Sequence, residues 1–353
     1  MLHLKKALIA GLLTTALFLT GVTGNAREVV RDPFIDWENL ENPVLEYENW
    51  SIKDYAAAYR DGTFYVFYSA FYEDRGKTRS HVVEVTTKDW KTFSEPILHV
   101  DGREDGWTGM CSPNLTEAHG KYYLTFNSWG KKHPNEGTND LFYMESEDLV
   151  NWSPYKRIAA EYTKDKTCID VCILYENGKF YLFWKDDYLM GDDFRFKKTR
   201  LAVADNIDGP YELVGTGYPS LLMDYTRENG QHHENYCVFK SDGVWHMLTS
   251  DYGGPMRRGV WLYQLLGHPA ADYSYLTWGN GYAFNLKRGD WNPDDKANAS
   301  AIYDWREHDG YFYLLFAGSK DEDASGYEYA GRGWNRLGLA RSRDLVHWVM
   351  AGE

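Results

Sequence analysis

Short polar turns followed by aromatic-rich segments recur along the chain at regular spacing. Each turn ends in glycine, and the residues behind it are mostly Tyr, Phe, Val, Leu and Trp. Asp-Gly and Asn-Gly turns favour β-hairpins, because a type I′ turn needs a positive φ at both central residues. The flanking residue types have high strand propensity. We therefore expect five hairpins, at residues 59–69, 117–128, 175–187, 240–253 and 307–319.

The spacing of these turns predicts the architecture. The turn glycines are Gly62, Gly120, Gly178, Gly243 and Gly310, separated by 58, 58, 65 and 67 residues. Each interval accommodates about four short strands, and β units that repeat at this period are typical of β-propellers. Helical periodicity is nearly absent beyond the N-terminal segment. The sequence therefore predicts an all-β fold, a five-bladed β-propeller.

The N-terminal residues have the layout of a secretory signal peptide. Lys5 and Lys6 precede an apolar run over residues 7–22, and small residues follow up to Ala26. The run is shorter than the roughly 20 apolar residues of a membrane anchor. We expect a signal peptide over residues 1–26, one catalytic propeller domain over 27–353, and a secreted or periplasmic protein.

Composition limits the partners. With 38 Lys+Arg against 52 Asp+Glu the net charge is −14, so nucleic acid and anionic membranes are poor partners. The chain is 16% aromatic, which allows a few rings to stack on sugar faces. The four cysteines, Cys111, Cys168, Cys172 and Cys237, contain no C-x-x-C pair for zinc. Both free thiols and disulfides stay open, and so does the oligomeric state.

Three carboxylates occupy nearly the same position in three blades. Asp54 and Asp170 each lie eight residues before a turn glycine, and Glu234 lies nine before the next one, an offset that a β-bulge absorbs. The first strand of each propeller blade lines the central channel, so these side chains should meet at one end of it. Like charges that converge raise at least one pKa, and such groups favour a functional site over a structural one.

These motifs resemble glycoside hydrolase family 43 and its five-bladed relatives. The segments "KDYAAAYRDGTFYVFYS", "CIDVCILYENGKFYLFW" and "HHENYCVFKSDGVWHMLTSDYG" match in order and spacing. The resemblance implies Asp54 as general base, Glu234 as general acid and Asp170 as the group that orients Glu234 and raises its pKa. It implies an inverting hydrolase with an oligosaccharide or polysaccharide substrate, exo-acting and of the α-L-arabinofuranosidase or β-xylosidase type. No cofactor is required.

Two departures from the family pattern leave alternatives open. The family's Glu-Gly-Pro is Glu234-Asn235-Tyr236 here, and residues 297–305 lack the histidine that holds a channel ion in many members. A channel calcium held by the carboxylates with His232 or His233 therefore lacks support. A related family that cleaves anhydrogalactose from agar oligosaccharides uses a histidine as acid, so His232 and His233 also keep that activity open. A non-catalytic sugar-binding propeller is the alternative of another class.

Substrate contacts are expected near the channel ends of the strands. Asn114 and His233 lie within two residues of the shared position and are the preferred hydrogen-bonding residues. The other candidates are His232, Trp107, Trp129, Trp184 and Tyr252.

Overall fold

The computed structural model describes residues 33–130, 139–164, 167–190, 194–214, 233–251, 259–266, 277–284, 286, 291–292, 297–319 and 335–353. Residues 34–353 form one compact unit. The predicted signal peptide lies outside the described residues. In the part of the chain that is described, no helix is long and apolar enough to cross a bilayer.

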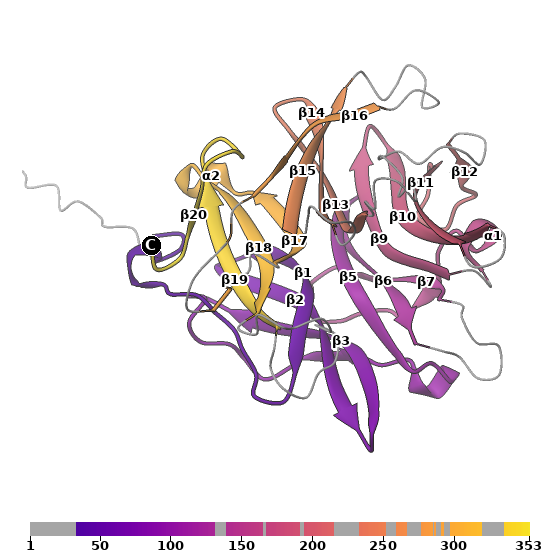
Figure 1. Cartoon of the computed structure of the whole chain (residues 1–353), viewed down its shortest axis with the longest axis horizontal. Helices are drawn as coiled ribbons and strands as arrows, with labels where there is room; N and C mark the ends of the chain where they lie inside the picture. Colours follow the sequence, from indigo (N-terminus) through magenta and orange to yellow (C-terminus); the bar gives the residue numbers. More distant parts are fainter. Residues whose placement is uncertain are drawn as a thin grey trace, which may run out of the picture. The chain divides into compact units, whose positions relative to one another are not determined.

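Five blades, each of four antiparallel strands, follow one another along the chain (Figure 1). A single parallel pair, Ser80 with Gly109, joins blades one and two into one sheet. Blade one contains β1 (Ser51–Arg60), β2 (Thr63–Asp74), β3 (Lys77–Thr87) and β4 (Leu98–Val100). Blade two contains β5 (Gly109–Ala118), β6 (Lys121–Trp129), β7 (Leu141–Ser146) and β8 (Lys156–Arg157). Blade three contains β9 (Thr167–Glu176), β10 (Lys179–Met190), β11 (Phe194–Ala204) and β12 (Glu212–Leu213). Blade four contains β13 (His233–Ser241), β14 (Val244–Asp251), β15 (Gly259–Leu266) and β16 (Thr277–Ala283). Blade five contains β17 (Asn298–Asp304), β18 (Phe312–Ser319), β19 (Asn335–Ser342) and β20 (Trp348–Met350).

The first strands of the blades form a closed ring. β1 contacts β5, β5 contacts β9, β9 contacts β13, β13 contacts β17, and β17 contacts β1 again. Each neighbouring pair of blades encloses its own cluster of buried apolar side chains, for example Phe67 with Leu124 between blades one and two. The same holds for the pairs two–three, three–four, four–five and five–one. The predicted five-bladed propeller is confirmed.

The predicted hairpin turns form in four of the five blades. The residue before each of the first four turn glycines and the glycine itself both have positive φ, as in Asp61 (51°) and Gly62 (79°). This is the type I′ geometry that the sequence predicts. Blade five differs, because the short helix α2 (Arg306–Asp309) occupies the connection between β17 and β18 and Gly310 caps it.

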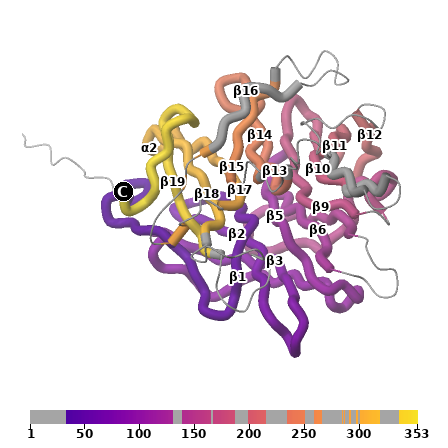
Figure 2. Tube along the Cα trace, viewed as in Figure 1, coloured from indigo at the N-terminus to yellow at the C-terminus, as the bar shows by residue number. Residues whose placement is uncertain are grey.

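The ring is closed by the segment that precedes blade one. The backbone of Val44 and Leu45 pairs with Leu337 in β19, through hydrogen bonds of 2.9 Å. The side chain of Asn42 both donates to and accepts from the backbone of Leu339, at 2.8 Å each. Figure 2 shows this N-terminal segment, in indigo, beside the yellow C-terminal blade. Residues before blade one thus complete blade five.

All four cysteines, Cys111, Cys168, Cys172 and Cys237, are buried and free. Of the two alternatives left by the sequence, the structure shows thiols. Each lies on a first strand, where small apolar side chains pack around the channel.

A buried carboxyl between blades one and two predicts a pH-dependent stability. Glu84 is 1% exposed, and its carboxyl group accepts a hydrogen bond from the indole N–H of Trp152 at 3.0 Å. Burial raises its pKa from 4.5 to about 8. Between pH 4.5 and about 8, Glu84 is therefore protonated in the folded protein and ionised in the unfolded chain. The free energy of unfolding falls as pH rises through this range, because folding then requires the uptake of a proton.

We expect Glu84→Gln to be more stable than the wild type at pH 8, by on the order of 2 kcal/mol. Thermal unfolding of both proteins from pH 5 to 8 measures the effect, and the variant should show the flatter pH dependence. Glu73→Gln, at an exposed position of β2, is the matched control. If the slope of the wild type persists in Glu84→Gln, another group causes it.

Candidate active site

The first strands of blades one to four carry a β-bulge at the same position. In each, two residues face a single residue of the second strand. The first residue of each bulge is left-handed, with φ of 56° for Asp54, 57° for Ser112, 55° for Asp170 and 56° for Asn235. Bulges redirect side chains near active sites. These four residues form one level around the channel.

The residue types at this level suit the backbone they occupy. Asp and Asn enter the left-handed region more readily than other non-glycine residues. Four strained positions at one level, which cost of order 1–3 kcal/mol each, persist only where the surroundings determine them. The surroundings here are hydrogen bonds that join one bulge to the next.

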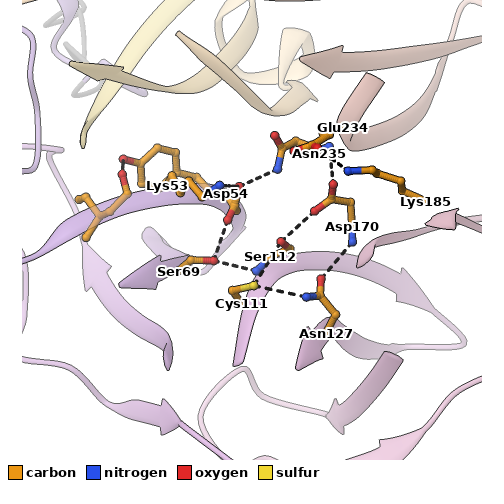
Figure 3. Close-up of polar contacts among 12 residues, drawn as sticks. Lys53, Asp54, Ser69, Cys111, Ser112, Asn127, Asp170, Lys185, Glu234 and Asn235 are labelled. Atoms are coloured by element: carbon orange, nitrogen blue, oxygen red, sulfur yellow. Dashed lines mark hydrogen bonds and ion pairs between the residues drawn. The ribbon is translucent and has the colours of Figure 1, made fainter. Parts of the chain in front are cut away.

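These hydrogen bonds form a closed circuit through four blades (Figure 3). Ser69 Oγ donates to Asp54 Oδ2 at 2.9 Å and accepts from the Ser112 N–H at 2.7 Å. Ser112 Oγ donates to Asp170 Oδ1 at 2.9 Å. The Asn235 N–H donates to Asp170 Oδ2 at 3.0 Å, and Asn235 Nδ2 donates to Asp54 Oδ1 at 2.8 Å. Asp54 and Asp170, each 4% exposed, are held rigidly as a result.

The electrostatic environment of Asp170 matches the sequence expectation that a pKa is raised. Burial is the largest cause and the negative charge of Glu234 the second, and together they raise the pKa of Asp170 to about 6. The ammonium of Lys185 and the N–H of Asn235 act in the opposite direction. Asp170 therefore exchanges its proton close to neutral pH.

Glu234 lies one residue before the bulge level, and Asn235 takes the position that matches Asp54 and Asp170. The one-residue offset that the sequence shows for Glu234 is therefore present in the structure. The prediction that a bulge places Glu234 at the level of Asp54 and Asp170 is wrong. Its side chain is 17% exposed and accepts a hydrogen bond from the buried ammonium of Lys185 on β10. Three carboxylates from blades one, three and four meet at this end of the channel (Figure 3).

Of the predicted substrate contacts, Asn114 lies beside these carboxylates, and Trp129 lies at the same end of its strand pair in blade two. Asn114 lines a narrow pocket together with Asp54, Ser112 and Asp170. Trp129, the last residue of β6, is half-buried and contacts the ring of Phe71 edge-on, with centroids 5.3 Å apart.

The structure gives two other candidates a packing role. Trp107 and Trp184 are 4% and 1% exposed and lie in the clusters between blades, which leaves no face for a sugar. Trp107 and Trp129 both lie near strand ends, so sequence position could not separate them. Trp184 lies in the middle of β10, although the sequence predicted it near the channel end. His232 and Tyr252 lie outside the described residues, and of His233 the structure describes the backbone only, paired with Asp251.

Counting back from the turn glycine fails in blade five. The count leads to Ile302, a buried residue of the cluster between blades four and five, because α2 lengthens the connection. The pairing of strands shows which residue of blade five matches the site residues of blade one. Asn298 faces Ala317 as Lys53 faces Ser69, so Asn298 takes the position of Lys53.

Three site residues on the second strands were not predicted from the sequence. Ser69, Asn127 and Lys185 each lie seven residues after a turn glycine, and each contacts the next blade near its bulge. A comparison of second strands, made in the same way as for first strands, would have found them.

The described side chains do not fit a channel cation. Among them, no group of three or more His, Cys, Asp or Glu residues could hold a metal. All four carboxylate oxygens of Asp54 and Asp170 already accept hydrogen bonds from protein donors.

Comparison with solved structures confirms the fold and its likeness to family 43. A thermostable family-43 glycoside hydrolase shares 13% identity, with 89% of this chain and 96% of that chain covered and a TM-score of 0.62. An exo-1,5-α-L-arabinanase from a bovine ruminal metagenomic library shares 13%, with 86% and 97% covered and a TM-score of 0.53.

A third structure belongs to work on the GH130 family of mannoside phosphorylases, which contains glycoside hydrolases that target β-1,2 mannosidic linkages in Candida mannan. It shares 14% identity, with 88% of this chain and 94% of that chain covered and a TM-score of 0.61. No protein-family model matches the sequence, and no significant match occurs among curated proteins. At these identities the likeness establishes the fold, a five-bladed propeller of the kind found in glycoside hydrolases.

Proposed function

We propose that the protein is an exported glycoside hydrolase that inverts the anomeric centre of its substrate. The observation that supports this most is the meeting of three carboxylates at one end of the channel, two of them buried in one hydrogen-bond circuit. Burial of charged groups is costly unless they are paired or used. A binding protein for neutral sugars has no need of them.

Each carboxylate suits a different role. Glycoside cleavage with inversion needs one carboxylate to activate water and one carboxylic acid to protonate the leaving oxygen. Asp54 accepts two hydrogen bonds from neutral donors, which favours its charged form and the role of general base. Glu234 is the most exposed of the three and is the proposed acid. Asp170 holds Asn235 through its N–H and places negative charge beside Glu234.

The substrate proposed is a plant or algal oligosaccharide, attacked from its end, with α-L-arabinofuranosides and β-D-xylosides first. The family resemblance of the motifs supports this, and an arabinanase is among the proteins with the same fold. The half-buried Trp129 at the channel end offers a ring edge or face to such a sugar. Export rests on the layout of residues 1–26.

A screen of nitrophenyl glycosides and natural oligosaccharides, agar fragments included, tests the proposal. We expect hydrolysis of at least one arabinofuranoside or xyloside, with the inverted anomer as first product by proton NMR. Binding of sugars without hydrolysis would identify a sugar-binding propeller instead. A retained anomer would overturn the roles given to Asp54 and Glu234.

A further inference from the structure

Blades one and two use the same contact to hold the next blade. Ser69 Oγ accepts a hydrogen bond from the N–H of Ser112, and Asn127 Oδ1 accepts one from the N–H of Asp170 at 3.0 Å. In both cases a neutral side chain of the second strand satisfies the backbone at the bulge of the following blade. This contact serves the scaffold, because a buried N–H without an acceptor is costly.

Blade three departs from that pattern at Lys185. A lysine ammonium has three donors and no acceptor, so it cannot receive the N–H of Asn235. Asp170 Oδ2 accepts that N–H instead, and the ammonium of Lys185 donates to Glu234 Oε1. In blade three a carboxylate, Asp170, therefore makes the contact that a neutral second-strand side chain makes in blades one and two. The second-strand residue Lys185 carries a positive charge instead, and this charge faces Glu234.

The burial of Lys185 makes this charge costly for the fold. Its side chain is 1% exposed, whereas that of Glu234 is 17% exposed. A buried ion pair seldom adds net stability over a neutral or apolar pair, and Ser or Asn at this position keeps the blades joined in the preceding repeats. A role in the chemistry of Glu234 therefore explains this lysine better than a contribution to the stability of the fold.

We propose that Lys185 is a positioning residue that fixes the carboxyl group of Glu234 and stabilises its anion after it has given up its proton. This inference rests on the proposed function. In the step concerned, the glycosidic C–O bond breaks, the proton of Glu234 passes to the leaving oxygen, and water, losing a proton to Asp54, bonds to the anomeric carbon. Glu234 becomes negatively charged at that moment, next to the ammonium.

The other charged groups around Glu234 make the ammonium more important. Asp170 on β9 lies close enough to interact electrostatically with both Glu234 and Lys185, and Asp54 on β1 interacts with Asp170. Lys53 Nζ lies 3.8 Å from Asp54 Oδ1, on the side of blade one. Lys185 thus offsets the two negative charges of blades three and four.

Lys185→Met tests the proposal. We expect kcat on glycosides with poor leaving groups to fall about 10- to 100-fold, and kcat on dinitrophenyl glycosides to change less than about threefold, because the latter need little protonation. The ammonium favours the charged form of Glu234, so its removal should move the alkaline limb of kcat/KM up by about one pH unit. Lys185→Arg, which keeps the charge, should restore that limb.

Lys240→Met is the matched control. Lys240 also pairs with a glutamate between blades three and four, Glu176, at the far end of β9, and its loss should leave rates and pH limbs unchanged. Should Lys185→Met fold poorly, Lys185→Gln provides a second neutral variant. Carbon-13 NMR of the Glu234 carboxyl, assigned with Glu234→Gln, gives a readout without substrate and should show a higher pKa in Lys185→Met.

An unchanged Glu234 titration, or equal losses of kcat for good and poor leaving groups in a folded variant, would overturn the proposal. An inactive wild type with a shifted Glu234 titration in Lys185→Met would instead overturn the proposed function and leave the pairing of the two residues intact.

Discussion

Asp54→Asn is expected to lower kcat by about 10³-fold or more on every glycoside that the wild type hydrolyses, while binding changes little. The amide cannot take a proton from water, and loss of a general base costs up to about 10⁴-fold. Steady-state rates combined with calorimetric binding of the same oligosaccharide measure the two effects separately.

The structure indicates that this variant keeps its fold. Asparagine tolerates the left-handed φ of 56° at this position, its oxygen can accept from Asn235, and its amide can donate to Ser69. Asp61→Asn is the matched control, since Asp61 is an exposed aspartate with φ of 51° in the same blade. A folded Asp54→Asn protein with more than about a tenth of the wild-type rate would contradict the role of base.

Glu234→Gln is expected to lose about 10²- to 10⁴-fold in kcat on natural oligosaccharides and much less on dinitrophenyl glycosides. The difference arises because a leaving group that departs as a stable anion does not need the proton of Glu234. A plot of log kcat against leaving-group pKa should therefore be steeper for the variant. The alkaline limb of the pH profile should also disappear with substrates that need the acid.

Glu176→Gln controls for the loss of a glutamate that pairs with a lysine between the same two blades, and should leave the plot unchanged. Equal losses on both substrate types would remove Glu234 from the role of acid. The histidines beside it in the sequence would then become the candidates.

The number of blades and the position of their first strands follow from turn signals that are visible in the sequence. A type I′ turn is specified by two residues, as at Asp61 and Gly62, and its repetition sets the number of blades. Because the strands that precede these turns in blades one and three, β1 and β9, have 10 residues each, counting back from the glycine also places Asp54 and Asp170 at one level. Where a helix entered the connection, as α2 does before Gly310, the count failed.

Contacts between blades could not be predicted by counting residues from the turn glycines. The ion pair of Lys185 and Glu234 joins residues 49 positions apart, and nothing local to either residue specifies it. The same limit applies to Trp184, whose ring turns into the core because of side chains from blade two. Counting located Glu234 to within one residue of the shared level, and only the structure shows that Asn235 occupies the bulge.

The pairing of the N-terminal segment with β19 has a consequence for the timing of activity. Asp54 follows the segment by a few residues, whereas Leu337 and Leu339, which that segment binds, are made almost 300 residues later. During synthesis Asp54 is therefore among the first parts of the propeller to be made, and the ring that holds it rigid closes only after the last blade has been made. A chain that stops before blade five has its carboxylates but no closed ring around them, so the site is assembled only once the whole propeller has been made.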